Sequence, residues 1–556
     1  MRYQIYQIIQ NELNKLFQGK QFQPCDLNFV VEIPKVKEHG DYSTNIAMML
    51  APKQRMNPRK IAEIITAQLL NQHIFEKVEI AGPGFINMWI KRESYHYALW
   101  KVLTDLEGYG RSNYGQNKKV LIEFVSANPT GPLHLGHGRG AAFGDTLARI
   151  LKYCGFEVFK EFYINDAGRQ IRLLGLSIYS RFRQRMDPSY PFPEDGYHGT
   201  YIYDLLEEIE KSVNLSSLKE EEAIQICSKY GKELMLKEIE SDLSGFGVYF
   251  DIWTSERDLY DKGKVQSTID RLREMGFIYE SNGAVWLKTT TFGDDKDRVI
   301  KKSDGEYTYF ASDIAYHLDK WERRYDQAID VWGADHHGYI GRVNAALSCL
   351  NIPNDWLKVL LIQLVKLWSH GNEIKMSKRA GTYVTLRELI TEAGVDASRF
   401  IFLTKHNDST LDFDLDLAKK QDTDNPVYYI QYAHARLSSI LRKSPIKEIE
   451  LKDINIQDLS RLTLVEEIDL IKAILDFPNT LEDIARTFEP HRLTYYLMDI
   501  ASLFHKYFNL GNKDPEKRVI CKDEELTRAR LCLVMVLKSV IAKGLELLGV
   551  SQPESM

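Results

Sequence analysis

Cysteine is scarce in this chain, with six residues among 556. The six lie far apart, at Cys25, Cys154, Cys227, Cys349, Cys521 and Cys532. None forms a CxxC pair, which argues against a zinc knuckle and against a disulfide framework. Long apolar runs are also missing, and the N-terminal stretch MRYQIYQIIQNELNKLF is an amphipathic helix with polar breaks rather than a signal peptide. The sequence therefore predicts a reduced, cytoplasmic protein without zinc and without a membrane span.

Charge of one sign does not dominate. The 72 Lys and Arg residues against 78 Asp and Glu residues give a formal net charge of −6. This sum does not exclude a nucleic-acid partner, because a basic face can coexist with acidic surface elsewhere. A hydrophobic content of 44% is ordinary for a globular protein, and 556 residues exceed one hydrophobic core. Three or four domains are expected.

Residues 118–149, KKVLIEFVSANPTGPLHLGHGRGAAFGDTLAR, are predicted to form a buried strand, a turn and the start of a helix. VLIEFV is the kind of short apolar run that a parallel sheet buries. His134 and His137 follow one helical turn apart, with Gly136 and Gly138 beside them. A helix N-terminus offers backbone N–H groups to an anion, and imidazoles add further donors. The stretch therefore predicts a triphosphate site.

Two other interpretations of this stretch compete with the triphosphate site. Gly136-x-Gly138-x-x-Ala141 fits a dinucleotide fingerprint, with Glu157 about twenty residues further on. That motif needs a tight turn, whereas about ten residues separate Val125 from the glycines, and it gives the histidines no role. For the HxxH pattern alone, a histidine pair that caps a helix is the better alternative.

The first 112 residues are predicted to form a small α/β domain. We expect a helix at 3–17, a strand in FVVEIP, one helical stretch from STNIAMM to TAQLL, and a strand–turn–strand in VEIAGPGFINMWI. Phe85 and Asn87 leave that turn on the same side of a strand. An aromatic with an amide suits an unpaired base, although a core Phe with a strand-end Asn explains the pattern equally well.

Residues 113–370 are predicted to form a doubly wound α/β domain with a parallel sheet. EVFKEFYI is its second strand, and the sheet resumes near 305 with GEYTYFASDIAYHLDKW, QAIDVWGADHHGYIGRVNAALSCL and the single strand VLLIQLVKL. Residues 175–300 are expected to be an insertion with helices at 204–213, 218–240 and 260–275. Ligands of such sheets bind at the carboxyl ends of the strands, where we place Ser126–His137, Ser312–Asp313 and Gly333–His337.

Residues 371–424 contain the basic loop KMSKRAGT at 375–382. A charge run is usually solvated surface, but this one follows the last sheet strand and could fold over a triphosphate. LDFDLDLA, at 411–418, imitates the start of a calcium loop. Leu417 replaces the required glycine and Thr423 replaces the final glutamate, so a half-buried strand is predicted instead.

From residue 425 to 556 the pattern is helical throughout. NPVYYIQYAHARLSSILRK begins with Pro426 at a helix opening, and Tyr428, Tyr432 and Arg436 share one face of that helix. Such a face suits unstacked bases, and a seam between helices fits it equally well. Further helices are predicted at 458–474, 478–486, 490–508 and 523–549, which together form a bundle.

HLGH and KMSK, about 240 residues apart, resemble the two signature motifs of class I aminoacyl-tRNA synthetases. The longer string ANPTGPLHLGH is similar to the arginyl-tRNA synthetase family, as are FYINDAGRQI, GADHHGY, LDFDLDLAKKQ and NPVYYIQYAHAR. The resemblance covers essentially the whole chain, and its one departure, Leu135 in the first motif, is a conservative apolar exchange.

The resemblance implies that ATP activates L-arginine to arginyl-adenylate, releasing diphosphate, and that arginine is then transferred to the 3′-terminal adenosine of tRNA(Arg). It implies Mg²⁺ carried with ATP, a monomer, and arginine activation that depends on tRNA. It also implies a tRNA-elbow domain at 1–112, a Rossmann-like catalytic domain at 113–370, a KMSK loop and stem-contact region at 371–424, and an anticodon-binding bundle at 425–556.

The resemblance also assigns roles to residues. It implies ATP contacts from His134, Gly136, His137, Gly138, Lys375, Met376 and Lys378, with His134, His137, Lys375 and Lys378 as the catalytic set. For arginine it implies Glu123, Ser126, Asn128, His137, Tyr309, Asp313 and His337, and for tRNA it implies Phe85, Asn87, Tyr428, Tyr432 and Arg436. Carboxylates fit a guanidinium, which is always charged. For Asp313 alone, a helix N-cap before IAYHL is a strong alternative.

Two rival functions compete with this interpretation. A small HxGH nucleotidyltransferase would need neither the N-terminal domain nor the helical C-terminal region. A non-catalytic tRNA-binding paralogue would be expected to have lost the HLGH and KMSK residues, which are intact here.

Overall fold

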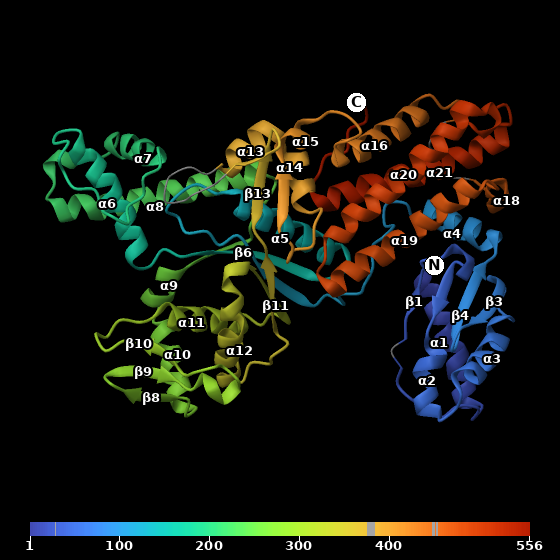
Figure 1. Cartoon of the computed structure of the whole chain (residues 1–556), viewed down its shortest axis with the longest axis horizontal. Coiled ribbons are helices and arrows are strands. Elements are labelled where there is room, and N and C mark those ends of the chain that lie inside the picture. Colours follow the sequence, from blue (N-terminus) through green and yellow to red (C-terminus); the bar gives the residue numbers. More distant parts are fainter. Residues whose placement is uncertain (28, 375–383, 447–450, 452–453) are drawn as a thin grey trace.

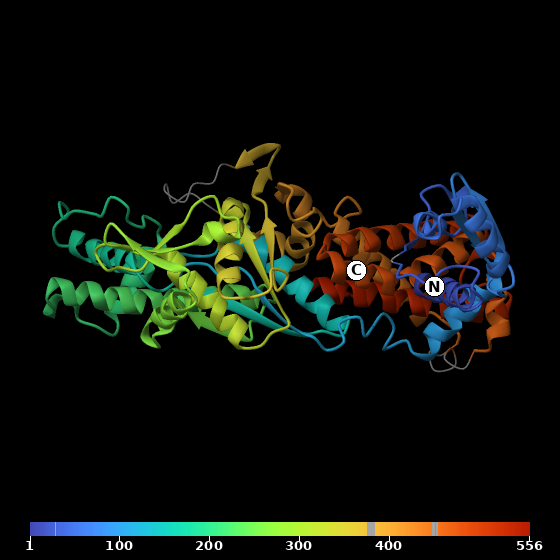
Figure 2. The same cartoon turned by 90° about the horizontal axis from the view of Figure 1, so that it is seen from below.

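The structure is a computed structural model, and it describes residues 1–27, 29–374, 384–446, 451 and 454–556. The molecule is elongated (Figures 1 and 2). One end holds the helices α6 (Arg169–Gln184), α7 (Tyr201–Glu210) and α8 (Glu220–Gly245). The other end holds the C-terminal helices and the N-terminal domain, and the parallel sheet lies between the two ends. Among the described residues, no helix has the length and apolar character that a membrane span requires.

The N-terminal domain is an antiparallel sheet with helices packed against it. Its strands, in the order β1-β2-β4-β3, are β1 (Val31–Glu32), β2 (Tyr42–Thr44), β4 (Phe85–Ile90) and β3 (Phe75–Ala81). Its helices are α1 (Arg2–Gln18), α2 (Ile46–Gln54) and α3 (Pro58–Leu69), while α4 (Arg92–Thr104) follows β4 and packs on the C-terminal helices. The single helical stretch expected from STNIAMM to TAQLL is two helices, because Asn57 caps α3 and Pro58 opens it.

The central sheet confirms the doubly wound fold predicted from the sequence. Its five parallel strands, in the order β12-β11-β5-β6-β7, are β12 (Leu357–Ile362), β11 (Gln327–Gly333), β5 (Lys119–Glu123), β6 (Glu157–Ile164) and β7 (Ile252–Ser255). The chain runs outward in one direction from β5 through β6 to β7, and then in the other direction through β11 to β12. The strand order therefore reverses between β5 and β11, the position where such sheets bind ligands.

The strand β7 lies inside the stretch 175–300, which the sequence alone led us to treat wholly as an insertion. The chain leaves the sheet through α6–α8, returns for β7, and leaves again through α9 (Glu256–Asp261) and α10 (Lys264–Glu274). The antiparallel strands β8 (Ile278–Ser281), β9 (Ala284–Leu287) and β10 (Arg298–Lys301) follow. β7 was missed because it is an edge strand of four half-buried residues, IWTS, without an apolar run.

Two further strand predictions were wrong. GEYTYFASD contains no strand: α11 (Tyr309–Glu322) starts inside it, so Ser312 and Asp313 lie on a helix rather than at a strand end. VLLIQLVKL holds two strands, β12 and β13 (Val365–Ser369). β13 leaves the parallel sheet and forms a smaller sheet with β14 (Asn372–Ile374) and β15 (Leu411–Asp414). In LDFDLDLA, the first half is the predicted half-buried strand, and α15 (Leu415–Lys419) follows it.

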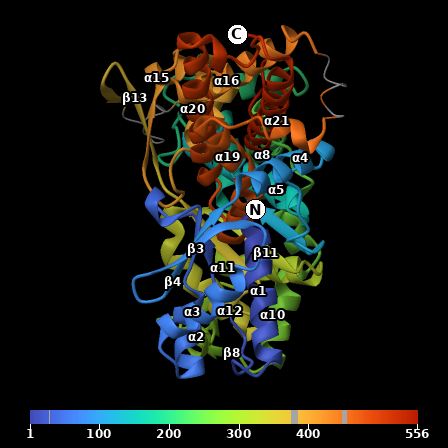
Figure 3. The same cartoon turned by 90° about the vertical axis from the view of Figure 1, so that its right-hand side faces the viewer.

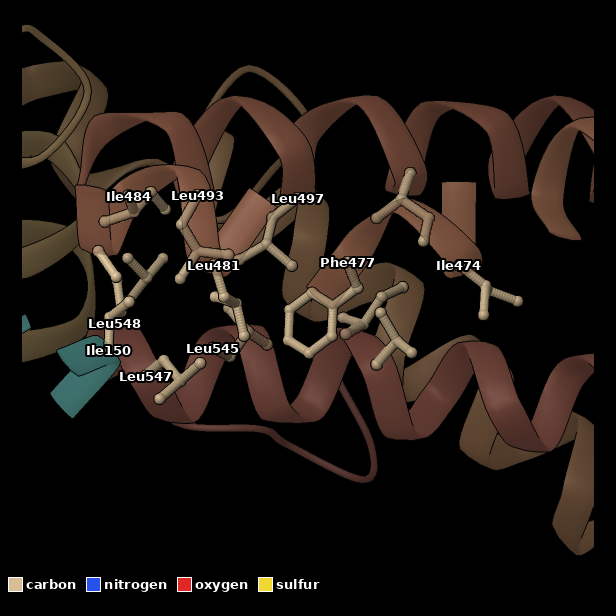
Figure 4. Packing of buried hydrophobic residues seen from close by; sticks show 14 of the residues in the cluster. Ile150, Ile474, Phe477, Leu481, Ile484, Leu493, Leu497, Leu545, Leu547 and Leu548 are labelled. Carbon is tan, nitrogen blue, oxygen red and sulfur yellow. The ribbon is translucent and has the colours of Figure 1, made fainter. Parts of the chain in front are cut away.

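The C-terminal part is the predicted helical bundle. Its helices are α16 (Pro426–Arg442), α18 (Ile456–Leu459), α19 (Val465–Thr487), α20 (His491–Lys513) and α21 (Glu524–Leu548). Figure 4 shows Phe477, Leu481, Leu497 and Leu545 packed between α19, α20 and α21, with Ile150 beside the same core. Ile150 belongs to α5 (Leu135–Tyr153), so the domain of the parallel sheet and the bundle share apolar packing.

The N-terminal domain packs on the same bundle, as Figure 3 shows end-on. Arg2 forms an ion pair with Asp483 of α19 at 2.6 Å, and His96 Nε2 lies 3.0 Å from the Leu462 carbonyl oxygen.

The helix α19 continues through Pro478, where two separate helices were predicted. A proline inside a helix leaves the carbonyl four residues earlier without its N–H donor. Here that carbonyl belongs to Ile474, and the Tyr109 hydroxyl donates to it at 2.8 Å. A side chain from outside the bundle thus replaces the missing backbone bond, and the helix is not broken.

Candidate active site

The two histidines of HLGH lie at the N-terminus of α5 and cap it reciprocally. Gly136 N donates to His134 Nδ1 at 3.1 Å, and His134 N donates to His137 Nδ1 at 3.2 Å. The rings stack with 3.7 Å between their centroids. Because each Nδ1 accepts a hydrogen bond, the neutral rings carry their protons on Nε2, in the tautomer that donates to a phosphate oxygen. The helix cap and the predicted phosphate site therefore use opposite nitrogens of the same rings, and the two interpretations are compatible.

Two of the glycines predicted for ATP have packing roles in this structure. A Cβ at Gly136 would lie 3.0 Å from the His134 ring, which folds back over it. A Cβ at Gly138 would lie 2.8 Å from Leu386, at the start of α13 (Leu386–Ala393). Both glycines therefore allow the close approach of neighbouring groups to the helix start, and Gly138 faces protein.

The connection from β5 to this helix passes through left-handed backbone. Val125 has φ +70° and Ser126 has φ +41°, conformations that are rare for residues with a side chain, above all for β-branched valine. The turn aims Ser126 Oγ between two elements: it donates to Glu123 Oε1 at 2.8 Å and accepts from Tyr163 N at 3.2 Å. The strained turn therefore joins the carboxyl ends of β5 and β6.

Glu123 lies in a buried ionic network. Lys320, fully buried on α11, donates to Glu123 and to Asp330, the latter at 2.7 Å. His317 Nε2 lies 2.9 Å from the second Asp330 oxygen. Burial raises the pKa of Glu123, while the Lys320 and His317 contacts hold the pKa of Asp330 down at about 2. Both Glu123 oxygens have protein partners, Ser126 and Lys320.

Tyr309 and Asp313 lie one turn apart at the start of α11. Tyr309 is 58% exposed, and its hydroxyl lies beside Gly168, the N-cap of α6. Asp313 is half-buried and accepts a hydrogen bond from the Tyr339 hydroxyl; burial raises the pKa of its carboxyl. The N-cap of α11 is Thr308, so the alternative role of Asp313 as a helix cap is wrong.

A second carboxylate beside Asp313 was missed by the sequence analysis. Glu256 directly follows β7, at the carboxyl edge of the sheet, and is 2% exposed. Its Oε1 accepts from Ser312 Oγ at 2.7 Å, and its Oε2 is buried without a hydrogen-bond partner among the described residues. Burial, with Asp313 and Asp166 nearby, raises the pKa of Glu256 to about 7. A buried, unsatisfied carboxylate oxygen is the feature expected where a cationic ligand binds.

Recognising β7 would have placed Glu256 in the site, because the residue after a parallel strand is a candidate ligand position. The hydroxyls of Tyr163 and Tyr316 are also buried without partners among the described residues. These two rings stack with 4.2 Å between their centroids. Burial, together with the nearby Glu256 and Asp313 carboxylates, raises the pKa of the Tyr163 hydroxyl.

The structure describes two other predicted positions, Asn128 and His337. Asn128 Nδ2 donates to Gln170 Oε1 at 2.7 Å, which ties the turn to the start of α6. His337 is exposed in the short helix η4 (Ala334–Tyr339), at the carboxyl end of β11. The predicted residues Lys375, Met376 and Lys378 lie outside the described part of the chain.

The predicted tRNA contacts lie in the two outer domains. Phe85 is half-buried at the start of β4, and Asn87 is 4% exposed with its Oδ1 accepting from Ser43 Oγ at 2.8 Å. The amide oxygen of Asn87 thus accepts a hydrogen bond inside the sheet. The contact of Asn87 with a base stays a prediction.

On α16, Tyr428, Tyr432 and Arg436 share one face, as predicted. The tyrosine rings stack, and the Arg436 guanidinium lies between Tyr432 and Phe508, 4.4 and 4.3 Å from the two ring centroids. Tyr432, Arg436 and Phe508 border a pocket of about 460 Å³ that is open to solvent and large enough for a nucleobase. Within the described residues, no group of three or more His, Cys, Asp or Glu side chains is arranged to hold a metal ion.

Family models match nearly the whole chain. Residues 3–90 match the arginyl tRNA synthetase N terminal domain, residues 99–423 match the catalytic domain of class I (R) tRNA synthetases, and residues 430–556 match the DALR anticodon binding domain.

Curated relatives are similar over the same length. The chain is 48% identical to the arginine–tRNA ligase of Desulfosudis oleivorans over 531 residues, covering 95% of this chain and 94% of the relative. It is 48% identical to that of Aquifex aeolicus over 570 residues, covering 95% and 96%. The Thermus thermophilus arginyl-tRNA synthetase structure has the same fold, with a TM-score of 0.80 at 23% identity and full coverage of both chains. The chain belongs to the arginyl-tRNA synthetase family, class I ligases that use ATP to charge tRNA(Arg) with arginine.

Proposed function

We propose that arginine is activated at the carboxyl edge of the five-stranded sheet, between the start of α5 and the start of α11. The arginine carboxylate attacks the α-phosphorus of ATP in line. A carboxylate oxygen–phosphorus bond forms as the bond to the departing diphosphate breaks. This chemistry needs placement and positive charge more than it needs a proton-transfer base.

The α5 terminus supplies the ATP half of this site. Its dipole favours the polyphosphate, and the Nε2–H groups of His134 and His137 are the proposed donors to it. Lys375 and Lys378, with Met376, are proposed to complete this half from the second motif. Mg²⁺ is proposed to arrive on the ATP oxygens, which suits an ion that is usually bound through substrate phosphates.

The observation that carries the arginine assignment is the pair of acids at Asp313 and Glu256. Two carboxylates in a desolvated site match a guanidinium, which binds acids bidentately and cannot lose its charge at neutral pH. The Tyr309 hydroxyl is proposed as a further acceptor for the guanidinium. Asn128, Ser126 and His337 are proposed to hold the α-amino and carboxylate end, with Glu123 as support.

We further propose that Phe85 and Asn87 contact the tRNA elbow, and that Tyr428, Tyr432 and Arg436 contact the anticodon. Support comes from the base-sized pocket on α16 and from the match to an anticodon-binding family model. We propose that the protein acts as a monomer in the cytoplasm, where its six free thiols stay reduced.

The test is ATP–diphosphate exchange and tRNA charging with each amino acid in turn. Of the amino acids tested, wild type should activate only arginine. Its exchange activity should require tRNA(Arg). Asp313→Asn and Glu256→Gln should each raise the KM for arginine far more than the KM for ATP. Asp319→Asn is the matched control, because Asp319 lies on the same helix but pairs with Lys264 and Arg323. Wild-type arginine kinetics in both acid variants would refute the assignment. Absence of charging by wild type would indicate a tRNA-binding paralogue.

A further inference from the structure

Arg139 is a fully buried arginine on the helix that carries the HLGH histidines. It lies two residues after His137 on α5 and is 1% exposed. Its Nη1 donates to the carbonyl oxygens of Gln363 at 2.7 Å and Ser409 at 2.9 Å. Its Nη2 donates to the carbonyl oxygen of His406 at 2.9 Å. One guanidinium therefore joins the catalytic helix to two separate segments of chain.

This charge is buried without a carboxylate partner among the described residues. The charge of Asp408 raises the pKa of Arg139, but the Asp408 side chain is 68% exposed and pairs with His406. Burial lowers the pKa of Arg139 to about 10, so the group stays ionised at neutral pH. A buried charge that only carbonyl dipoles compensate is costly, and an apolar side chain would fill the space at lower cost. The Arg139 guanidinium supplies five N–H donors in a rigid fork, and an apolar residue supplies none.

The three carbonyls lie at the base of the smaller sheet. Gln363 precedes β13 by two residues, and Ser409 precedes β15 by two residues. β13 and β15 pair in parallel from their first residues, Val365 and Leu411. Arg139 thus holds the starting points of both strands with one planar group. β13 turns back into β14, which ends at Ile374, the residue immediately before Lys375 in the sequence.

A second attachment to the same helix start lies on the other side of the Lys375 stretch. Leu386 N donates to the Leu133 carbonyl oxygen at 2.8 Å, and Thr385 forms a bridge with His134. The chain is therefore tied to the beginning of α5 both before residue 375 and after residue 383. The first tie is made by the Arg139 side chain and can be removed by substitution. The second is made by backbone atoms.

We propose that Arg139 is a positioning residue for ATP. It holds the start of α5, and with it His134 and His137, against the β13–β15 sheet. Arg139 does not contact the reacting atoms. This inference rests on the proposed ATP role of His134 and His137, and it adds a residue that neither motif contains.

The test uses Arg139→Lys and Arg139→Gln in the full-length protein with tRNA(Arg) present. Lysine keeps the charge but cannot reach three carbonyls as a planar fork. Because misplacement by about 1 Å can cost about 10²-fold in rate, kcat/KM for ATP in diphosphate exchange should fall by about 10- to 100-fold in Arg139→Lys. The dissociation constant for arginine, measured by calorimetry without ATP, should change less than about twofold, since the acid pair is untouched.

Arg399→Lys is the matched control for loss of a buried arginine. Arg399 is also fully buried, and it donates to Asp145 on α5, to Leu548 O and to Phe246 O at 2.7–3.0 Å. All three of these acceptors lie outside the β13–β15 sheet. The substitution should lower the unfolding midpoint while keeping the KM for ATP.

Wild-type kcat/KM for ATP in Arg139→Lys would overturn the inference, and so would an equal loss of ATP and arginine affinity in a folded Arg139 variant. If Arg139→Gln does not fold, the lysine variant decides. Failure of the wild-type protein to activate arginine would refute the proposed function instead, so the two failures are distinguishable.

Discussion

Ser312 Oγ lies 2.7 Å from Glu256 Oε1, so α11, the helix that precedes β11, fixes a carboxylate that directly follows the edge strand β7. The neighbouring residue, Asp313, presents the second acid. The arginine side of the proposed site is thus assembled from β7 and α11, which are separate in sequence and meet only at the carboxyl edge of the sheet.

Arginine binding should depend on pH through Glu256. Its pKa is raised from the ordinary 4.5 to about 7, and only the ionised form pairs with a guanidinium. We therefore expect the dissociation constant for arginine to decrease as pH rises from 5 towards 7 and to level off above that. Calorimetric titration across this range is the measurement. Glu256→Gln should bind weakly with a flat profile, and a steep profile in that variant would assign the titration to another group.

The same pKa shift sets the sign of an effect on stability. A carboxyl whose pKa is raised on folding adds stability that is fully present below pH 4.5 and is lost as pH rises through about 7. The ligand-free wild-type protein should therefore lose more stability between pH 5 and pH 8 than Glu256→Gln does, measured by urea unfolding. Saturating arginine should restore part of the loss at pH 8. Parallel curves for the two proteins would contradict this expectation.

Lys320 should be essential for folding stability. Lys320→Met leaves Glu123 and Asp330 buried without their shared cation, and breaking a buried ion pair in this way costs about 3–5 kcal/mol. Urea titration gives the loss directly. Lys264→Met is the control, since Lys264 pairs with Asp319 and Glu322 at a partly exposed position and should cost no more than about 1 kcal/mol. Equal losses in the two variants would mean that the network contributes little.

The contact between α5 and β5 should tolerate no side chain at Gly144. A Cβ there would lie 2.3 Å from the Phe124 ring, so Gly144→Ala should destabilise by about 1–3 kcal/mol through overpacking. A Cβ at Gly140, one helical turn earlier, would meet no described atom within 4 Å beyond its own helix backbone and chain neighbours. Gly140→Ala should therefore stabilise the helix by about 0.5–1 kcal/mol. Chemical denaturation of both variants checks the contrast, and the same sign in both would refute it.

Tyr109 and Pro478 should be thermodynamically coupled. Tyr109→Phe leaves the buried Ile474 carbonyl without a donor, at a cost of about 1–3 kcal/mol. Pro478→Ala restores the N–H that an α-helix aims at that carbonyl, so the tyrosine substitution should cost much less in that background. A double-mutant cycle of unfolding free energies measures the coupling. Strictly additive effects would show that the hydroxyl does not replace the backbone bond.

Apolar patterning predicted the strands that are buried on both faces, including the stretch around VLIEFV, which is β5. It also located the histidines at a helix start, because the glycine–proline turn before them excludes helix. The alternation of strands and helices thus predicted the fold class, and the turn predicted the helix start that carries the proposed ATP-binding histidines.

The proposed arginine-binding acids were harder to predict from the sequence. Glu256 follows a four-residue edge strand with no apolar run, and Asp313 lies on a helix where a strand end was expected. The helix through Pro478 depends on Tyr109, a partner 365 residues distant from Ile474. Each of these features depends on a long-range contact, which local patterns do not contain.

The ties between α5 and the last helix have a consequence for the time course of synthesis. Arg149 Nη1 lies 3.3 Å from the Glu546 carbonyl oxygen, and Arg399 donates to that of Leu548. Glu546 is added 397 residues after Arg149, roughly 20–80 s later at ordinary elongation rates of about 5–20 residues per second. A nascent chain already holds both histidines and both acids long before α5 is anchored at its far end. The far end of α5 therefore acquires its contacts with α21 only after α21 has emerged from the ribosome.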